Sequence, residues 1–194
     1  MKKFLTLTLV AAATASFGAS INWGTTSAAT FNGTKMGGVK ATLIHIGATD
    51  LAEDATFTIT ASSTLSSLAN TIGTDTESTT TSTASGMGLG KVAGTWTFDS
   101  GLSNNDYVAI LLSYTAEGVT WYNLTTTTKV TYNEVAGVWN NSSNAANWSY
   151  SGGTADDSKT GTIKAGGGWT AVPEPSTAAL ALAGLALLLK RRKA

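Results

Sequence analysis

The sequence predicts an all-β domain, a β-sandwich of jelly-roll or immunoglobulin-like type with at most one short helix. Three observations lead to this prediction: segments rich in β-branched and aromatic residues recur along the chain, clusters of Gly, Asn, Asp and Ser separate them, and only one stretch has helical spacing. The chain of 194 residues has no cysteine, which excludes disulfides, iron–sulfur clusters and thiol catalysis. Such a domain must be held together by its apolar core.

Six segments have the composition of strands, and turn-forming residues such as Glu117-Gly118 separate them. The expected strands are 39–46, 55–60, 92–98, 107–114, 119–124 and 129–135. The fourth of these is apolar almost throughout, as is typical of a strand that is buried on both faces. We therefore expect it to be central, with a second sheet on one face and the helix on the other.

The helix is expected at 64–72, where apolar residues recur at helical spacing, and Ser62 or Ser63 would cap its N-terminus. The Thr/Ser-rich stretch 74–85 shows no periodicity and is interpreted as a mobile surface loop. The Gly/Asn/Ser-rich residues 140–171 are interpreted as a distal part and flexible stem. These assignments place the β-sandwich at residues 20–139.

The N-terminal residues 1–19 have the features of a secretory signal peptide. Met1-Lys2-Lys3 is a basic start, an apolar stretch follows, and small residues near Ala19 offer cleavage sites. The mature chain is expected to begin between Ala19 and Ile21. A secretion translocon and signal peptidase are the partners that such a segment requires.

The C-terminal residues 172–194 have three parts. The tripeptide Pro173-Glu174-Pro175 precedes an apolar run, 176–189. A basic cluster follows this run and consists of Lys190, Arg191, Arg192 and Lys193. The 14-residue run would span about 21 Å as a helix, less than the roughly 30 Å of a bilayer core. A short span can still insert when the bilayer thins, and the basic cluster would keep its end cytoplasmic. We expect a transmembrane sorting segment.

The order of these three parts resembles the PEP-CTERM sorting signal of Gram-negative bacteria. The resemblance implies recognition by an exosortase-like membrane transpeptidase and cleavage near Pro173, Glu174 and Pro175. It also implies export through the inner membrane, then display at the cell surface or release, often in organisms that make exopolysaccharide. The resemblance is confined to the tail and says nothing of what the central domain does.

Without its two ends, the chain is acidic. Six lysines, no arginine and eleven acidic residues remain, a net charge of about −5. This composition argues against nucleic acid as a partner, because phosphates need Lys and Arg contacts. It argues equally against docking on anionic lipid.

No catalytic motif stands out, and the domain is expected to be neither an enzyme nor a holder of a cofactor or metal. His45, the only histidine, lies on an expected strand, where a structural role is favoured over that of a general base. A Ser-His-Asp triad stays open, because its members need not be close in sequence. Asp50, Glu53 and Asp54 form an acidic patch, as Asp156-Asp157 do, but neither has the spacing of a known calcium loop.

Aromatic residues are the one feature typical of binding. Trp121, Tyr122, Trp139 and Trp148 lie amid Asn, Ser and Gly, and exposed rings in such surroundings are suited to stacking on sugars. The alternative is core packing, which is common for Trp in sandwiches. Surface polysaccharide is the corresponding partner.

Three functions are consistent with these observations. The first is an exported, non-catalytic cell-surface or extracellular matrix protein. The second is a carbohydrate-binding surface module, and the third is a secreted glycan hydrolase.

Overall fold

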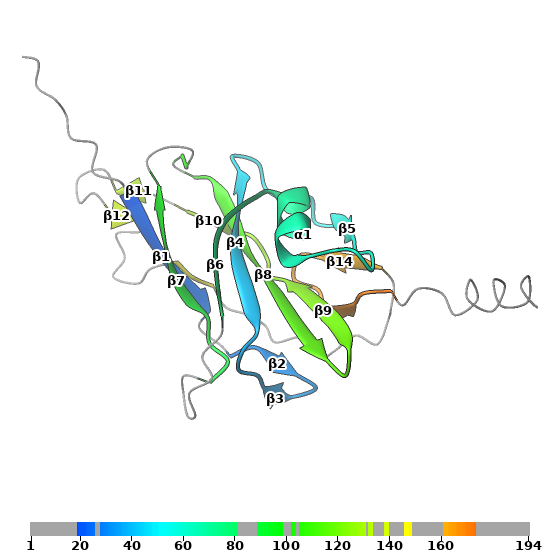
Figure 1. The fold of residues 1–194 in the computed structure, drawn as a ribbon. Helices are drawn as coiled ribbons and strands as arrows, with labels where there is room; N and C mark the ends of the chain where they lie inside the picture. Colours follow the sequence, from blue (N-terminus) through cyan, green and yellow to red (C-terminus); the bar gives the residue numbers. More distant parts are fainter. Residues whose placement is uncertain are drawn as a thin grey trace, which may run out of the picture.

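The structure is a computed structural model of the chain. It describes residues 19–25, 28–80, 89–98, 102–103, 105–130, 132–133, 138–139, 146–148 and 161–173. These residues form strands and one short helix, α1 (Leu65–Ile72), so the predicted all-β class is confirmed (Figure 1). The strands are β1 (Ala19–Thr25), β2 (Thr30–Phe31), β3 (Thr34–Lys35), β4 (Lys40–Gly47), β5 (Thr56–Thr58), β6 (Thr74–Thr80), β7 (Ala93–Phe98), β8 (Tyr107–Ala116), β9 (Val119–Leu124), β10 (Thr128–Lys129), β11 (Tyr132–Asn133), β12 (Val138–Trp139), β13 (Ala146–Trp148), β14 (Thr162–Lys164) and β15 (Thr170–Ala171).

The largest sheet in the described part of the chain has six strands. Five of them follow the order β15-β9-β8-β4-β6, and β10 also pairs with β8. All of its pairings are antiparallel. The β8–β9 hairpin turns at Glu117 and Gly118, whose φ angles are 51° and 78°. Positive φ at both turn residues matches the twist of the flanking strands, so this predicted turn sets the register of the two strands.

Smaller sheets lie against the large one. β1 pairs antiparallel with β7 and parallel with β13, β5 pairs with β14, and β2 pairs with β3. Figure 1 shows β1 and β7 to one side of the large sheet and α1, β5 and β14 to the other.

Side chains of β8 alternate between two cores. Val108, Ile110 and Leu112 belong to a core that also contains Ile21 and Trp23 of β1. Ala109 and Leu111 belong to a second core, together with the buried residues of α1 and with residues of β5 and β14. β8 is therefore central and covered on both faces, as predicted. Each fully buried Leu or Ile contributes about 1.5–3 kcal/mol, so this strand is a main source of stability.

The predicted helix is confirmed, but its expected N-cap is wrong. Thr64 has an extended backbone (φ −112°, ψ 163°), and its hydroxyl accepts a hydrogen bond from the Ser67 backbone N–H at 3.1 Å. The Ser67 hydroxyl in turn accepts from the Thr64 N–H at 2.8 Å, which completes a capping box. Ser63 has a different role, because its hydroxyl accepts from the Thr60 N–H at 2.9 Å.

The expected loop 74–85 is wrong over its first part, because 74–80 forms β6 along β4. Its polar side chains bond to β4: the Thr76 hydroxyl donates to the Leu43 carbonyl at 2.9 Å, and that of Ser78 donates to Thr42 at 3.1 Å. β-Branched Thr suits an outer strand without apolar alternation. Residues 81–85 lie outside the described part.

Five of the six expected strands are present, as β4, β5, β7, β8 and β9. The sixth, 129–135, is divided, since β10 pairs with β8 whereas β11 pairs with β12. The Val130 N–H donates to the Asp106 carbonyl at 2.8 Å, so the chain follows β8 only to this point.

The expected stem differs from the structure over 161–171, which is part of the fold. β14 pairs with β5, and β15 pairs with β9. Trp169, at 0% exposure, packs in the same core as Trp23. A large buried ring stabilises this segment, and Gly166 (φ 72°) serves a turn rather than a flexible spacer.

Among the described residues, no helix is both long and apolar enough to cross a membrane. The apolar run 176–189 lies outside them, so this finding leaves the expected transmembrane segment untested.

Candidate functional site

The sorting tripeptide follows the last strand of the large sheet without an intervening linker. Thr170 pairs with Tyr122 and Ala171 with Trp121, and the Val172 N–H then donates to the Thr120 carbonyl at 2.9 Å. Of the tripeptide, Pro173 is described, whereas Glu174, Pro175 and the basic cluster lie outside the described residues. The fold thus extends to the first residue of the tripeptide.

Pro173 packs against Gly161, at the start of β14. A Cβ on Gly161 would lie 3.0 Å from Pro173 Cγ, so glycine lets the ring approach closely. The Gly161 φ of 69° is also a conformation that favours glycine. The Gly161 carbonyl accepts from the Ile59 N–H at 2.6 Å, which ties this contact to the β5–β14 pair.

A small open pocket of about 230 Å³ lies beside Pro173. It is lined by Ala61, Ser63, Gly118, Val119, Thr120, Val172 and Pro173. None of these side chains is titratable, so the pocket itself provides no acid–base group. Its walls come from the segment before α1, the β8–β9 turn and the start of the tail.

Tyr122 is connected to this pocket through Ser63, one of the lining residues. The ring is 2% exposed, and its hydroxyl donates to the Ser63 carbonyl at 2.9 Å. Burial raises the pKa of the Tyr122 hydroxyl, and a hydrogen bond with Ser113 acts in the opposite direction. The glycan hypothesis assumes an exposed ring. The Tyr122 ring is instead buried and is not available for stacking on a sugar.

Trp121 lies on the opposite face of β9, in an aromatic cluster with Phe31, Tyr114 and Trp169. Its ring is half-buried and meets Phe31 edge-on at 5.1 Å and 71°. Phe31 also lies 5.6 Å from Tyr114 and 6.1 Å from Trp169. Phe31 and Tyr114 were not among the expected binding residues, although Tyr114 directly faces Trp121 across β8 and β9.

The other two residues of the glycan hypothesis cannot be placed in this cluster. Trp139 and Trp148 lie on β12 and β13, but their side chains lie outside the described part of the structure. The glycan hypothesis therefore depends here on Trp121 and its neighbours.

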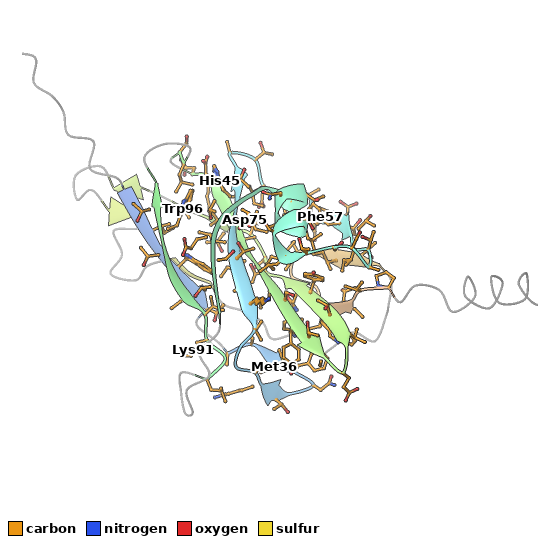
Figure 2. All side chains as sticks on the ribbon, viewed as in Figure 1. Met36, His45, Phe57, Asp75, Lys91 and Trp96 are labelled. Carbon is orange, nitrogen blue, oxygen red and sulfur yellow. The ribbon has the colours of Figure 1, made fainter. Side chains whose placement is uncertain are left out.

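His45 pairs with Asp106, a partner that the sequence analysis did not identify. His45 Nε2 lies 2.8 Å from Asp106 Oδ2, and the two side chains are 16% and 5% exposed. Asp106 Oδ2 also accepts from the Ser103 N–H at 2.7 Å, and the His45 ring lies 6.0 Å from that of Trp96 (Figure 2). The pair joins the end of β4 to the start of β8. A Ser-His-Asp triad would also need a hydroxyl nucleophile that is hydrogen-bonded to the other ring nitrogen of His45.

No group of three His, Cys, Asp or Glu side chains among the described residues is arranged to hold a metal ion. Asp50, from the acidic patch, accepts hydrogen bonds from the Leu51 N–H at 2.7 Å and from the Thr127 hydroxyl. These bonds fix a turn. Asp156-Asp157 lies outside the described residues.

Comparison with known protein families confirms the interpretation of the tail. Residues 171–193 match the PEP-CTERM protein-sorting motif. The match begins at Ala171, so the motif overlaps β15. It indicates an exported protein that is processed by an exosortase-like membrane enzyme. No curated protein and no solved structure matches this chain.

Proposed function

We propose that this protein is an exported, non-catalytic cell-surface or extracellular matrix protein, delivered through its PEP-CTERM tail. The observation that carries the proposal is the match at 171–193, placed where the last strand ends. An exosortase-like transpeptidase would cut the tail after the chain has crossed the inner membrane, and display or release would follow. We also propose that the protein associates with exopolysaccharide. The same proposal includes a fold of the jelly-roll or immunoglobulin-like sandwich type.

The start of the fold supports export through a signal peptide. β1 begins at Ala19, and the Ile21 and Trp23 side chains on it are each 2% exposed. Cleavage between Ala19 and Ile21 would leave both in the mature domain. A signal peptide can thus be removed without loss of these core residues.

The sorting step is tested by replacing the tripeptide in the full chain. With Pro173, Glu174 and Pro175 all changed to alanine, we expect an uncut protein retained in the inner membrane, because the apolar run and basic cluster still insert. Because Pro173 packs on Gly161, a second variant changes Glu174 and Pro175 alone and leaves the fold contact intact. Processed protein at the surface in both variants would refute the proposal.

A carbohydrate-binding module is the second candidate, and the aromatic cluster favours it. Trp121 and Phe31 are half-buried neighbours, so each keeps part of its ring in solvent. A glycan array on the purified protein and on Trp121→Ala tests this role. Loss of glycan retention in a folded variant would support it, whereas hydrolysis of mucin or plant glycans would instead indicate the third function, a hydrolase.

A further inference from the structure

The β2–β3 hairpin turns at Asn32 and Gly33, which form the only Asn-Gly pair in the sequence. Their φ angles are 49° and 77°, and positive φ at both positions is typical of a two-residue turn between antiparallel strands. Phe31 and Thr34 pair directly across this turn. The side-chain amide of Asn32 is thus followed by the backbone nitrogen of a residue that has no side chain to shield it.

The fold protects neither of these two groups. Asn32 and Gly33 are exposed, and neither the Asn32 amide nor the Gly33 N–H makes a hydrogen bond in the described part of the chain. Apart from its chain neighbours, nothing lies within 4 Å of the position that a Cβ on Gly33 would take. Asn123 differs, because it is 1% exposed and its amide donates to the Gly167 carbonyl at 3.3 Å. Water and base therefore reach the Asn32–Gly33 turn freely.

The hairpin is short enough to open locally. β2 and β3 have two residues each, and a ladder of this length is marginal by itself. β2 is anchored, because the Thr30 carbonyl accepts from the Trp169 indole N–H at 2.8 Å and the Phe31 ring is half-buried. Thr34 and Lys35 of β3 are both exposed. Opening can thus be confined to the turn and β3, without unfolding of the domain.

We propose that Asn32 is a site of spontaneous deamidation in the folded protein, with Gly33 as the internal nucleophile. The Gly33 nitrogen loses its proton and bonds to Cγ of Asn32, and the bond from Cγ to Nδ2 breaks. Ammonia leaves with that proton, and a cyclic succinimide remains. Water then opens the ring at either carbonyl carbon. It adds a hydroxyl to that carbon and a proton to the Gly33 nitrogen, which yields aspartate or isoaspartate.

The two products have different effects on the hairpin. Aspartate keeps the length of the main chain and adds one negative charge at the turn. Isoaspartate inserts one methylene into the main chain, so a turn of two residues no longer fits between Phe31 and Thr34. In this product β3 separates from β2, whereas Thr30 stays bonded to Trp169.

A first experiment compares the folded and the unfolded chain at the same pH and temperature. The purified full-length protein is incubated in detergent at mildly alkaline pH, with and without urea. Mass spectrometry of the peptide that contains Asn32 follows the exchange of its amide for a carboxyl. Global unfolding populates only about 10⁻³ to 10⁻⁶ of the molecules, so we expect the native reaction to be slowed by less than about a thousandfold. Slowing by about a thousandfold or more would overturn the proposal.

Two variants test the route and its consequence. Asn32→Gln keeps an amide but needs a larger ring, so its exchange should be at least about tenfold slower in the native protein; an equal rate would exclude attack by Gly33. Hydrogen exchange at the Thr34 and Lys35 amides should be faster in the isoaspartate fraction of the aged protein. Asn32→Asp is the matched control, because it carries the new charge without the extra methylene and should keep the wild-type exchange rate. Unchanged exchange in the isoaspartate fraction would overturn the separation of β3.

Discussion

Replacing Trp169 with alanine tests whether the C-terminal segment is part of the folded domain. The ring is fully buried, and emptying such a site costs about 3–5 kcal/mol. The Thr30 carbonyl would also lose its donor, which adds about 1 kcal/mol. Domains of this kind have a total free energy of unfolding of roughly 5–15 kcal/mol, so Trp169→Ala should remove a large fraction of it. For a domain of this size, the melting temperature should fall by roughly 10–20 °C.

The measurement is urea unfolding of residues 19–173, followed by circular dichroism. Trp169→Phe separates the two contributions, because it keeps a buried ring and removes the indole N–H. Trp121→Ala is the control, since its ring is only half-buried and should cost less than half as much. A loss below about 1 kcal/mol in Trp169→Ala would refute the conclusion that this segment is structural.

Three further predictions concern the rest of the domain. Gly94→Ala should destabilise it by about 1–3 kcal/mol in chemical denaturation, because the new Cβ would lie 2.7 Å from Cε2 of the buried Trp23 ring. Tyr122→Phe should cost about 1 kcal/mol near neutral pH, since the hydrogen bond to Ser63 is lost. The pKa of Tyr122 is raised in the folded state, so the unfolded chain ionises first as the pH increases. The wild type should therefore lose stability as the pH rises above about 10. Unfolding measured against pH should show that the Phe variant lacks this loss. The fragment 20–173 should be β-rich by circular dichroism and unfold at the same temperature with and without reductant, because it has no thiol; a helix-dominated spectrum would contradict the fold class.

The strands and the helix that were predicted correctly are those with a local signal. The 119–124 segment is β-branched and aromatic and is preceded by the turn residues Glu117-Gly118, and it forms β9 with the expected bounds. The helix at 64–72 showed apolar spacing, but Ser62, Ser63 and Thr64 are all suitable caps, so the sequence did not distinguish them. Only the backbone geometry of Thr64 decides the matter.

The elements that were missed depend on distant partners. β6 is polar on both faces, and its conformation follows from hydrogen bonds to β4. β14 and β15 are short strands that exist because β5 and β9 provide edges for them. Strands of two or three residues are too short to show a periodic pattern, so the sequence does not predict them.

Strand geometry separates two of the four aromatic residues in the glycan hypothesis. Trp121 and Tyr122 are neighbours on one strand, so their side chains must point to opposite faces. The structure places Trp121 beside Phe31 and Tyr122 against the second core. The two rings therefore lie on different faces of β9.

The bond between Trp169 and Thr30 joins residues that are 139 positions apart. The β2–β3 hairpin is synthesised early, but Trp169, which donates to it, is added only after most of the chain has been made. Folds dominated by such distant pairings form slowly, in about milliseconds to seconds. The entropy of loop closure is lost before the distant contacts form and stabilise the chain. This contact therefore cannot form before residue 169 has been synthesised, and the folding of the β2–β3 region is completed by one of the last segments of the chain.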